Sequence, residues 1–353
     1  MPGDFSTVPI VDFSRLTDPT SRDEELSRLR DAIFVVGFLY LINTGLEDSI
    51  HRTHKELPSL FNLPAEVKER CNMINSPSFR GTLGWGQRLL RPRPIFARYH
   101  VLFLQFDFGT PGMREWTENE PFWKRLEGPN QYPDYPGAEK LVRNYIESID
   151  SLAQKFVHLV AESLSLPPDT FDEFKGSMSR LKFVKYPPAK ALSQGVGPHK
   201  DSAGLFTFLS QDNIGGLQVL NNNGEWIDAP PLEDSLVVNI QQGFEAITGG
   251  ICPATTHRVI APTAKTRYSI PFFLSVRLDL TLEKLQASAS HIKARLPVPN
   301  TEKRRDVDVP SEFLSPLYSC FGEAHLRNRI ISHPDVGKKW YPDLYEKYSQ
   351  QRL

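Results

Sequence analysis

The sequence predicts a mainly β fold with helical additions: a double-stranded β-helix (jelly roll) buttressed by N-terminal and C-terminal helices. Short apolar segments separated by Gly, Pro and Asn turn signals fill the middle of the chain, as expected of a closed antiparallel barrel. Candidate metal ligands lie within these segments, which favours a barrel with an interior site. We expect a barrel core at residues 177–280, an N-terminal region at 1–176 that forms one structural unit with it, and a helical lid or extension at 281–353.

The N-terminal region is expected to alternate strands with amphipathic helices. Apolar residues recur at helical spacing over 21–36, and Gly37 is expected to end that helix. His51 and His54 lie on a second predicted helix, where we expect them on a solvated face. Strands are predicted at 8–13 and 37–43, and helices at 21–36, 47–61, 64–71, 138–165 and 167–174.

The barrel region has alternating or wholly apolar segments, and Asn223-Gly224 is typical of a tight hairpin turn. The segment 88–104 is unusual in sequence, and it would alter substrate choice if it lines the mouth of a pocket. Strands are predicted at 180–186, 205–209, 216–220, 225–227, 235–240 and 267–276, and helical segments at 281–291 and 312–333.

Three side chains are candidate metal ligands: His199, Asp201 and His257. Residues two apart in an extended strand point to the same face, so His199 and Asp201 converge while Lys200 points away. A single histidine beside a strand is more often a core or surface residue, and only the ordered set indicates a site. Two imidazoles and one carboxylate on one face of a metal are typical of non-haem Fe(II) centres, which keep the other positions open for O₂ and substrate.

A second pair of residues predicts an anion site in the same barrel. Arg267 and Ser269 are two apart on one predicted strand, so both face the same way. A buried arginine is costly unless an anion meets it, and its planar fork matches a carboxylate. Fe²⁺ with Asp201 leaves one positive charge, so a dicarboxylate together with Arg267 would bring the site to neutrality.

Composition excludes several classes of partner. Lys and Arg number 41 against 42 Asp and Glu, for a net charge of −1, which argues against nucleic acid or a membrane surface and favours a small-molecule substrate. The first residues show no signal-peptide pattern, and no apolar window is long enough to span a membrane. Cys71, Cys252 and Cys320 are expected to be free thiols, and we expect a cytoplasmic location.

The motifs described so far resemble, in order and spacing, those of the 2-oxoglutarate/Fe(II)-dependent oxygenases of the isopenicillin N synthase-like superfamily. The resemblance covers nearly the whole chain and implies a cupin-like barrel. The amino-acid sequence of these motifs is most similar to that of fungal members, many of which serve secondary metabolism. Further segments that carry it are Val8-Pro9-Ile10-Val11-Asp12-Phe13, Gln105-Phe106-Asp107-Phe108-Gly109, Tyr186-Pro187-Pro188 and Ala254-Thr255-Thr256-His257-Arg258-Val259.

The resemblance implies an enzyme, a dioxygenase that uses Fe(II), 2-oxoglutarate as cosubstrate and O₂. The iron would be held by the His199, Asp201 and His257 set, and the far carboxylate of 2-oxoglutarate by Arg267, Ser269 and Tyr186. Val184 stands where the family more often has Asn, so one polar contact is lost. The reaction implied is oxidation of an unactivated C–H bond by hydroxylation, desaturation or cyclisation.

Four residues are weaker candidates for substrate contact: Arg80, Phe206, Phe273 and Phe321. Arg80 resembles an arginine that meets the substrate carboxylate in the isopenicillin-synthase branch, and fixing a loop is the competing role. Phe206 and Phe273 are candidates for the pocket wall, with ordinary barrel packing as the alternative. Phe321 resembles a residue of the C-terminal lid, and it could equally belong to a plain packing helix.

Two other functions stay open at this point. An oxidase like isopenicillin N synthase would use Fe(II) and O₂ without 2-oxoglutarate, because the same Arg-x-Ser pair would hold the substrate's own carboxylate. A degenerate barrel could instead bind a ligand without turnover. Succinate formation would distinguish the 2-oxoglutarate-dependent dioxygenase from the oxidase, which forms none. O₂ consumption would distinguish it from a ligand-binding barrel, which consumes none. The residue pattern does not specify the substrate, the type of oxidation or the oligomeric state.

Overall fold

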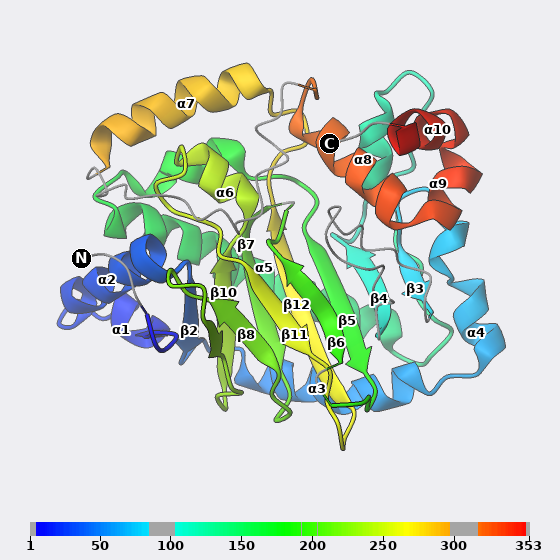
Figure 1. Cartoon of the computed structure of the whole chain (residues 1–353), viewed down its shortest axis with the longest axis horizontal. Coiled ribbons are helices and arrows are strands. Elements are labelled where there is room, and N and C mark those ends of the chain that lie inside the picture. Colours follow the sequence, from blue (N-terminus) through cyan, green and yellow to red (C-terminus); the bar gives the residue numbers. More distant parts are fainter. Residues whose placement is uncertain (1–4, 85–102, 192, 203, 297–316, 351–353) are drawn as a thin grey trace.

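The computed structural model describes residues 5–84, 103–191, 193–202, 204–296 and 317–350, and it contains two β-sheets that together form the predicted jelly roll (Figure 1). The larger sheet has the strand order β1-β2-β10-β7-β12-β5-β4-β3, and the smaller sheet has the order β6-β11-β8-β9. Strands β1 to β4 come from the N-terminal region and still belong to the larger sheet. That region therefore extends the barrel through shared strand hydrogen bonds.

The strands are short, as the turn signals predict, and all pair antiparallel except β1 with β2. In chain order they are β1 Ile10–Asp12, β2 Phe38–Ile42, β3 Gly81–Leu83, β4 Leu104–Gly109, β5 Arg180–Tyr186, β6 Gln194–His199, β7 Gly204–Gln211, β8 Leu217–Leu220, β9 Trp226–Asp228, β10 Ser235–Ile240, β11 His257–Ile260 and β12 Arg267–Ser275.

Helices cover the larger sheet and both of its ends. In Figure 1, α1 and α2 lie at the β2 end of the sheet and α8 to α10 lie near β3 and β4. The α-helices are α1 Phe13–Thr17, α2 Arg22–Asp31, α3 Glu47–Phe61, α4 Ala65–Arg70, α5 Ala138–Ser163, α6 Gln242–Ile247, α7 Leu282–Arg295, α8 Phe321–Ser332, α9 Pro334–Trp340 and α10 Pro342–Gln350.

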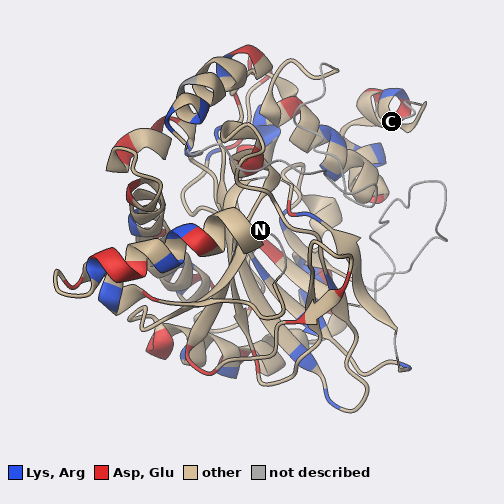
Figure 2. Ribbon diagram, turned by 60° about the vertical axis from the view of Figure 1, so that its left-hand side comes forward, with Lys and Arg blue, Asp and Glu red and all other residues tan. Residues whose placement is uncertain are grey.

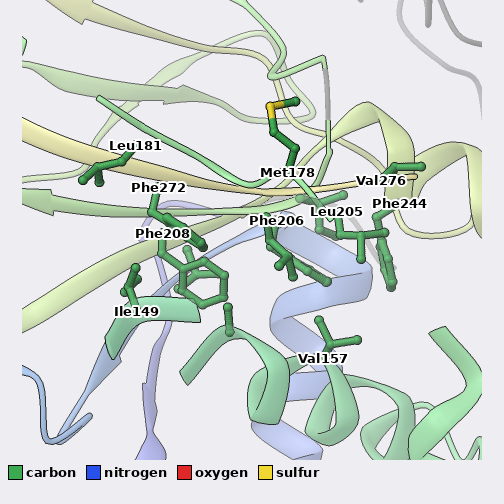
Figure 3. Close-up of a cluster of buried hydrophobic side chains, with 14 of the residues drawn as sticks. Ile149, Val157, Met178, Leu181, Leu205, Phe206, Phe208, Phe244, Phe272 and Val276 are labelled. Carbon is green, nitrogen blue, oxygen red and sulfur yellow. The ribbon is translucent and has the colours of Figure 1, made fainter. Parts of the chain in front are cut away.

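The main core lies between the larger sheet and α5, whose apolar stripe was visible in the sequence (Figure 3). Phe156 of α5 makes edge-to-face contacts with Phe206 and Phe208 of β7, with ring centroids 5.4 Å apart in each pair. Phe206 also contacts Phe244 of α6. The expectation that Phe206 lines the pocket is therefore wrong: its ring belongs to the core on the helix-covered face of the sheet.

Most predicted elements of the N-terminal region are confirmed. Ser21 precedes α2, which continues as one π-helical turn over Ala32–Val36, and Gly37 ends it with a left-handed φ of 69°. His51 is exposed as expected, but His54 is not on a solvated face. Its Nε2 lies 2.7 Å from the Ser210 hydroxyl, and burial, aided by the charge of Arg267, lowers the pKa of His54 to about 4.

Other elements differ in extent from the predictions. Helix α6 was not predicted, because the residues that follow the strand at 235–240 were taken as a connecting loop. Helix α7 runs four residues beyond the predicted end at residue 291. The first part of the helix predicted at 312–333 lies outside the described residues up to position 316, and α8 covers Phe321–Ser332. The unusual segment 88–104 lies outside the described residues up to position 102.

The surface and the cysteines agree with the composition. Acidic and basic residues are interspersed along the helices in Figure 2. All three cysteines are buried free thiols, as predicted. No helix in the described part of the chain combines the length and apolar character needed to cross a membrane.

Candidate metal centre

The three predicted metal ligands come together where strands β6 and β11 of the smaller sheet meet at their ends. His199 ends β6 and His257 begins β11, and the two residues are direct partners in the antiparallel register. Their ring centroids lie 4.3 Å apart. Asp201 follows just beyond β6, and one ligand atom from each of the three residues lies within 4.8 Å of the others. The spacing therefore suits a single metal ion bound from one side.

Each histidine is held in the tautomer that a metal requires. The Nδ1–H group of His199 donates to the backbone carbonyl of Gly197 at 2.9 Å, and that of His257 donates to the carbonyl of Thr255 at 3.1 Å. Both Nε2 lone pairs are then directed toward Asp201, at 3.7 and 3.8 Å from its carboxylate oxygens. Such backbone carbonyl partners are typical of metal-binding histidines.

The segment that holds His257 is fixed by the end of the first long helix. The Thr255 hydroxyl donates to the carbonyl of Val36 at 2.6 Å. A Cβ on Gly37 would lie only 2.6 Å from the carbonyl oxygen of Pro253 and 2.6 Å from the Thr255 hydroxyl. Gly37 is thus required for two reasons, its left-handed backbone and this close approach.

The Asp201 carboxylate is positioned by the larger sheet. Its Oδ2 accepts hydrogen bonds from the Thr207 hydroxyl at 2.6 Å and from the Asn239 side-chain amide at 3.0 Å. Burial alone would raise the pKa of Asp201, but the two neighbouring imidazoles and these hydrogen bonds outweigh it and hold the pKa below its usual value. Asp201 is therefore an ionised ligand at neutral pH, with its orientation set from β7 and β10.

Replacing Thr207 with valine is expected to weaken metal binding while the fold is retained. The change keeps the side-chain shape but removes one of the two hydrogen bonds to Asp201, and loss of such a partner typically costs about 10- to 100-fold in metal affinity. Anaerobic titration with Fe(II) measures the effect. Thr53→Val is the matched control, because Thr53 is equally buried and bonds only within α3. Equal Fe(II) affinity in both variants would contradict the role given to Thr207.

The predicted anion site is formed where β12 begins. Arg267 is paired with Tyr186 of β5, and its guanidinium carbon lies 4.9 Å from the Tyr186 ring centroid. Ser269 is buried on the same strand. The Arg267 Nε donates to the carbonyl of Ile214 at 3.2 Å, and one Nη donates to the Gln211 side chain at 2.8 Å. These bonds fix the guanidinium plane.

One nitrogen of the Arg267 guanidinium makes no hydrogen bond to the described residues. Nη1 of Arg267 is buried and finds no hydrogen-bond partner among the described residues. The whole side chain is 1% exposed, so water does not replace the missing acceptor freely. A buried guanidinium with one unused edge is the donor set that a carboxylate completes. The residues present therefore fit the acid group of a dicarboxylate cosubstrate.

The weaker candidates lie in three different places. Phe273 is on the same face of the larger sheet as Thr207, its direct partner in β7. Arg80 is fully buried beside Gly109, bonds to the Leu126 carbonyl and the Met178 sulfur, and has an Nη 3.6 Å from the Asp107 carboxylate. Phe321 begins α8 and is packed in the core cluster that also contains Leu280 and Leu285.

Several residues that support the site were not identified from the sequence. Thr207, Asn239 and Gln211 are polar residues inside otherwise apolar strands, which is the signal that could have found them. Which polar strand residue meets which ligand depends on the register between strands far apart in the chain. That register is a property of the folded barrel.

A jelly roll that brings two histidines and a carboxylate together is typical of a non-haem Fe(II) oxygenase. The protein-family models and the known proteins that match this chain agree with that class. Residues 175–276 match the model of the 2OG-Fe(II) oxygenase superfamily, and residues 8–135 match that of the N-terminal region of non-haem dioxygenases in morphine synthesis. The chain is 37% identical to the 2-oxoglutarate-dependent dioxygenase frbJ of Dothideomycetidae sp. (strain 11243), over 96% of this chain and 94% of that protein.

One further relative and one solved structure cover most of the chain. A 2-oxoglutarate-dependent dioxygenase of Gibberella zeae is 32% identical over 100% of this chain and 96% of its own. The fold is also similar to that of Neurospora crassa T7H in complex with alpha-KG and thymine, with a TM-score of 0.65, 24% identity, and coverage of 77% of this chain and 86% of that one. The chain belongs to the 2OG-Fe(II) oxygenase superfamily and is a dioxygenase of the class that uses Fe(II), 2-oxoglutarate and O₂.

Proposed function

We propose that His199, Asp201 and His257 bind Fe(II), that Arg267, Ser269 and Tyr186 bind 2-oxoglutarate, and that the enzyme oxidises a C–H bond of a small molecule. The observation that carries this proposal is the pairing of His199 with His257 across β6 and β11, with both Nε2 atoms directed at Asp201. The likeness to fungal 2-oxoglutarate-dependent dioxygenases supports the reaction class, and the role in fungal secondary metabolism is proposed from the family resemblance of the motifs alone.

The chain's own residues have defined tasks in this scheme. When bound, the iron supplies O₂ activation coupled to oxidation of 2-oxoglutarate. Asp201 supplies negative charge to the metal, and Thr207 with Asn239 holds it in place. Arg267 orients the far carboxylate of 2-oxoglutarate, and Gln211 with Ile214 fixes the guanidinium plane. The side chain of His199 is 34% exposed and that of His257 is 8% exposed, so substrate has access from the His199 side.

The type of oxidation depends on the substrate. Hydroxylation is the default outcome, and desaturation or cyclisation would require a substrate radical that reacts differently. The Neurospora crassa neighbour was solved with thymine, which supports a small-molecule substrate here as well. The two alternatives, an oxidase without 2-oxoglutarate and a barrel without turnover, are not favoured, because the related fungal proteins are 2-oxoglutarate-dependent dioxygenases.

Replacing Arg267 with alanine is expected to raise the 2-oxoglutarate concentration needed for half-saturation by about 10- to 100-fold, which corresponds to a lost charge-assisted hydrogen-bond pair. Anaerobic titration of the Fe(II) protein with 2-oxoglutarate, followed by the visible charge-transfer absorption of the chelate, measures this without turnover. Fe(II) affinity itself should be unchanged.

Arg258→Ala is the matched control for this titration. Arg258 is also in the barrel, but it stacks on Trp226 at 4.0 Å and bonds to Gln218, so its loss should leave 2-oxoglutarate binding unchanged. If the two variants titrate alike, Arg267 has a role in substrate binding or structure instead.

A further inference from the structure

The loop between β7 and β8, residues 212–216, contacts the start of β12, where Arg267 lies. Asp212 is the first residue of this loop and follows Gln211, the last residue of β7. The carbonyl of Ile214, in the middle of the loop, accepts the hydrogen bond from Nε of Arg267 at 3.2 Å. The orientation of the guanidinium therefore depends on where the loop holds the Ile214 carbonyl.

The Asp212 carboxylate fastens this loop to β12. One of its oxygens accepts a hydrogen bond from the backbone N–H of Tyr268 at 2.5 Å, and the other accepts from the backbone N–H of Ile214 at 3.0 Å. The Asp212 N–H group in turn donates to the carbonyl of Tyr268 at 3.2 Å. One carboxylate thus joins the residue that follows Arg267 in the chain to the loop residue whose carbonyl accepts from Arg267.

The other end of the loop is held by β11. The carbonyl of Gly216 accepts from the N–H of Ile260 at 2.8 Å. Gly216 has a φ of 116°, and a Cβ on it would lie 2.5 Å from the Ile260 carbonyl oxygen, so this position requires glycine. The loop is therefore fixed at both ends, and Asp212 supplies the contacts at the β12 end.

Asp212 is near Arg267 without occupying its anion-binding edge. Both Asp212 oxygens are used by backbone N–H groups, and Nη1 of Arg267 has no partner among the described residues. Burial raises the pKa of Asp212, although the two N–H groups and the charge of Arg267 act in the opposite direction. The carboxylate thus interacts with Arg267 through charge and leaves free the nitrogen assigned to 2-oxoglutarate.

A purely structural role for Asp212 would be to end the pairing of β7 with β12. That pairing runs as far as Gln211 and Ser269, and Asp212 follows directly. A structural role predicts lower stability and a weaker site whether or not Arg267 is present. A role in positioning Arg267 predicts that the effect on cosubstrate binding disappears once the guanidinium is removed.

We propose that Asp212 is a positioning residue for 2-oxoglutarate binding, which acts through Arg267 by holding the Ile214 carbonyl that fixes the guanidinium plane. The proposal rests on the proposed function, because it requires that Arg267 binds the far carboxylate of 2-oxoglutarate. Asp212 does not itself touch the cosubstrate. The orientation matters because a planar guanidinium binds a carboxylate best when its N–H groups are aligned with the carboxylate oxygens.

Asp212→Asn tests this role with almost no change in shape. Asparagine keeps one oxygen that can accept from Ile214, but its NH₂ group cannot accept from Tyr268. Anaerobic titration of the Fe(II) protein with 2-oxoglutarate, followed by the chelate absorption, should show half-saturation at an about tenfold higher concentration, as expected when a hydrogen bond to a charged group is weakened. Fe(II) affinity, measured without 2-oxoglutarate, should be unchanged.

Asp18→Asn is the matched control for this titration. Asp18 also accepts a hydrogen bond from a backbone N–H, that of Thr20 at 2.9 Å, but it lies in the turn between α1 and α2. This variant should titrate like the wild type. Asp212→Ser, whose shorter side chain keeps a single acceptor, is a second variant at the same position and should raise the half-saturating concentration as Asp212→Asn does.

A double-mutant cycle with Arg267→Ala separates positioning from structure. Because Asp212 acts through Arg267, adding Asp212→Asn to Arg267→Ala should not raise the half-saturating 2-oxoglutarate concentration any further. A further rise of about tenfold in the Arg267→Ala background would overturn the proposal. So would wild-type titration of both Asp212 variants, or an equal effect of Asp18→Asn.

The same titrations test the proposed function separately. If the wild type forms the chelate and Arg267→Ala weakens 2-oxoglutarate binding while the Asp212 variants do not, only the role of Asp212 is wrong. If the wild type forms no chelate, or if Arg267→Ala titrates like the wild type, the proposed binding of 2-oxoglutarate fails and the role of Asp212 fails with it.

Discussion

Asp201→Ala is expected to reduce 2-oxoglutarate-dependent O₂ consumption by more than about 100-fold, because loss of a direct ligand should exceed the 10- to 100-fold cost of losing an outer partner. The side chain supplies the only carboxylate of the His199, Asp201 and His257 set. The fold should persist, since the strands around it are held by the apolar cores on either side. Succinate release, O₂ uptake and bound iron measured on the same sample report the effect.

Asp228→Ala is the matched control for this experiment. Asp228 is an exposed strand residue of the smaller sheet that bonds to Gln218, so its loss should leave iron content and turnover unchanged. Normal O₂ uptake in Asp201→Ala would remove the iron assignment. If the melting temperature of Asp201→Ala equals that of the wild type, the loss of turnover in this variant is not caused by unfolding.

Asp107→Asn is expected to lower the free energy of unfolding more than any of the other substitutions discussed. The carboxylate is fully buried among four cations, and removing the charge of one partner from a buried ion pair costs about 3–5 kcal/mol of unfolding free energy. Here the cost falls at the upper end of that range, because several positive charges lose the same partner. Urea unfolding at pH 7 measures it, with the exposed Asp228→Asn as the control.

The pH dependence of this loss has a defined sign. Burial would raise the pKa of Asp107, but Arg180, Arg329, Lys182 and Arg80 together hold it far below the ordinary value of 3.8. A carboxyl whose pKa is lowered by folding contributes its full stability above the unfolded pKa and loses it as the pH falls toward the folded pKa. The stability difference between wild type and Asp107→Asn should therefore be constant from pH 7 to about pH 4 and shrink below that. A difference that already shrinks between pH 7 and 5 would contradict this.

Whereas His257 was assigned from the order and spacing of the motifs, the pair His199 and Asp201 could be predicted because side-chain alternation in an extended backbone is a local rule. It places His199 and Asp201 together without knowledge of any other strand, and the same rule places Arg267 beside Ser269. The fold class followed from the same segments. The extent of the helices was predicted well where Gly or Pro marks an end, as at Gly37, and less well at α6, where an apolar strand passes directly into a helix.

The Phe206 prediction failed because alternation does not say which face of a strand is inside. Phe206 and Thr207 are neighbours in β7 and point to opposite faces, and both faces of this strand are buried. Only the pairing of Thr207 with Phe273, and its bond to Asp201, shows which face meets the metal. The buried ion pairs of Asp107 could not be predicted from the sequence for a related reason. The four cations come from positions 80, 180, 182 and 329, which only the folded sheet and α8 bring together.

The direct partnership of His199 with His257 has a consequence for the apoprotein. The two ligands belong to strands whose register shifts irregularly just beyond this pair, so their alignment is set locally. An ion that binds both imidazoles cross-links β6 to β11 at their shared end, and by mass action its occupancy and the closure of that strand pair become one equilibrium. Loss of the ion would remove this cross-link, so the protein without metal should be less stable to unfolding than the metal-bound protein.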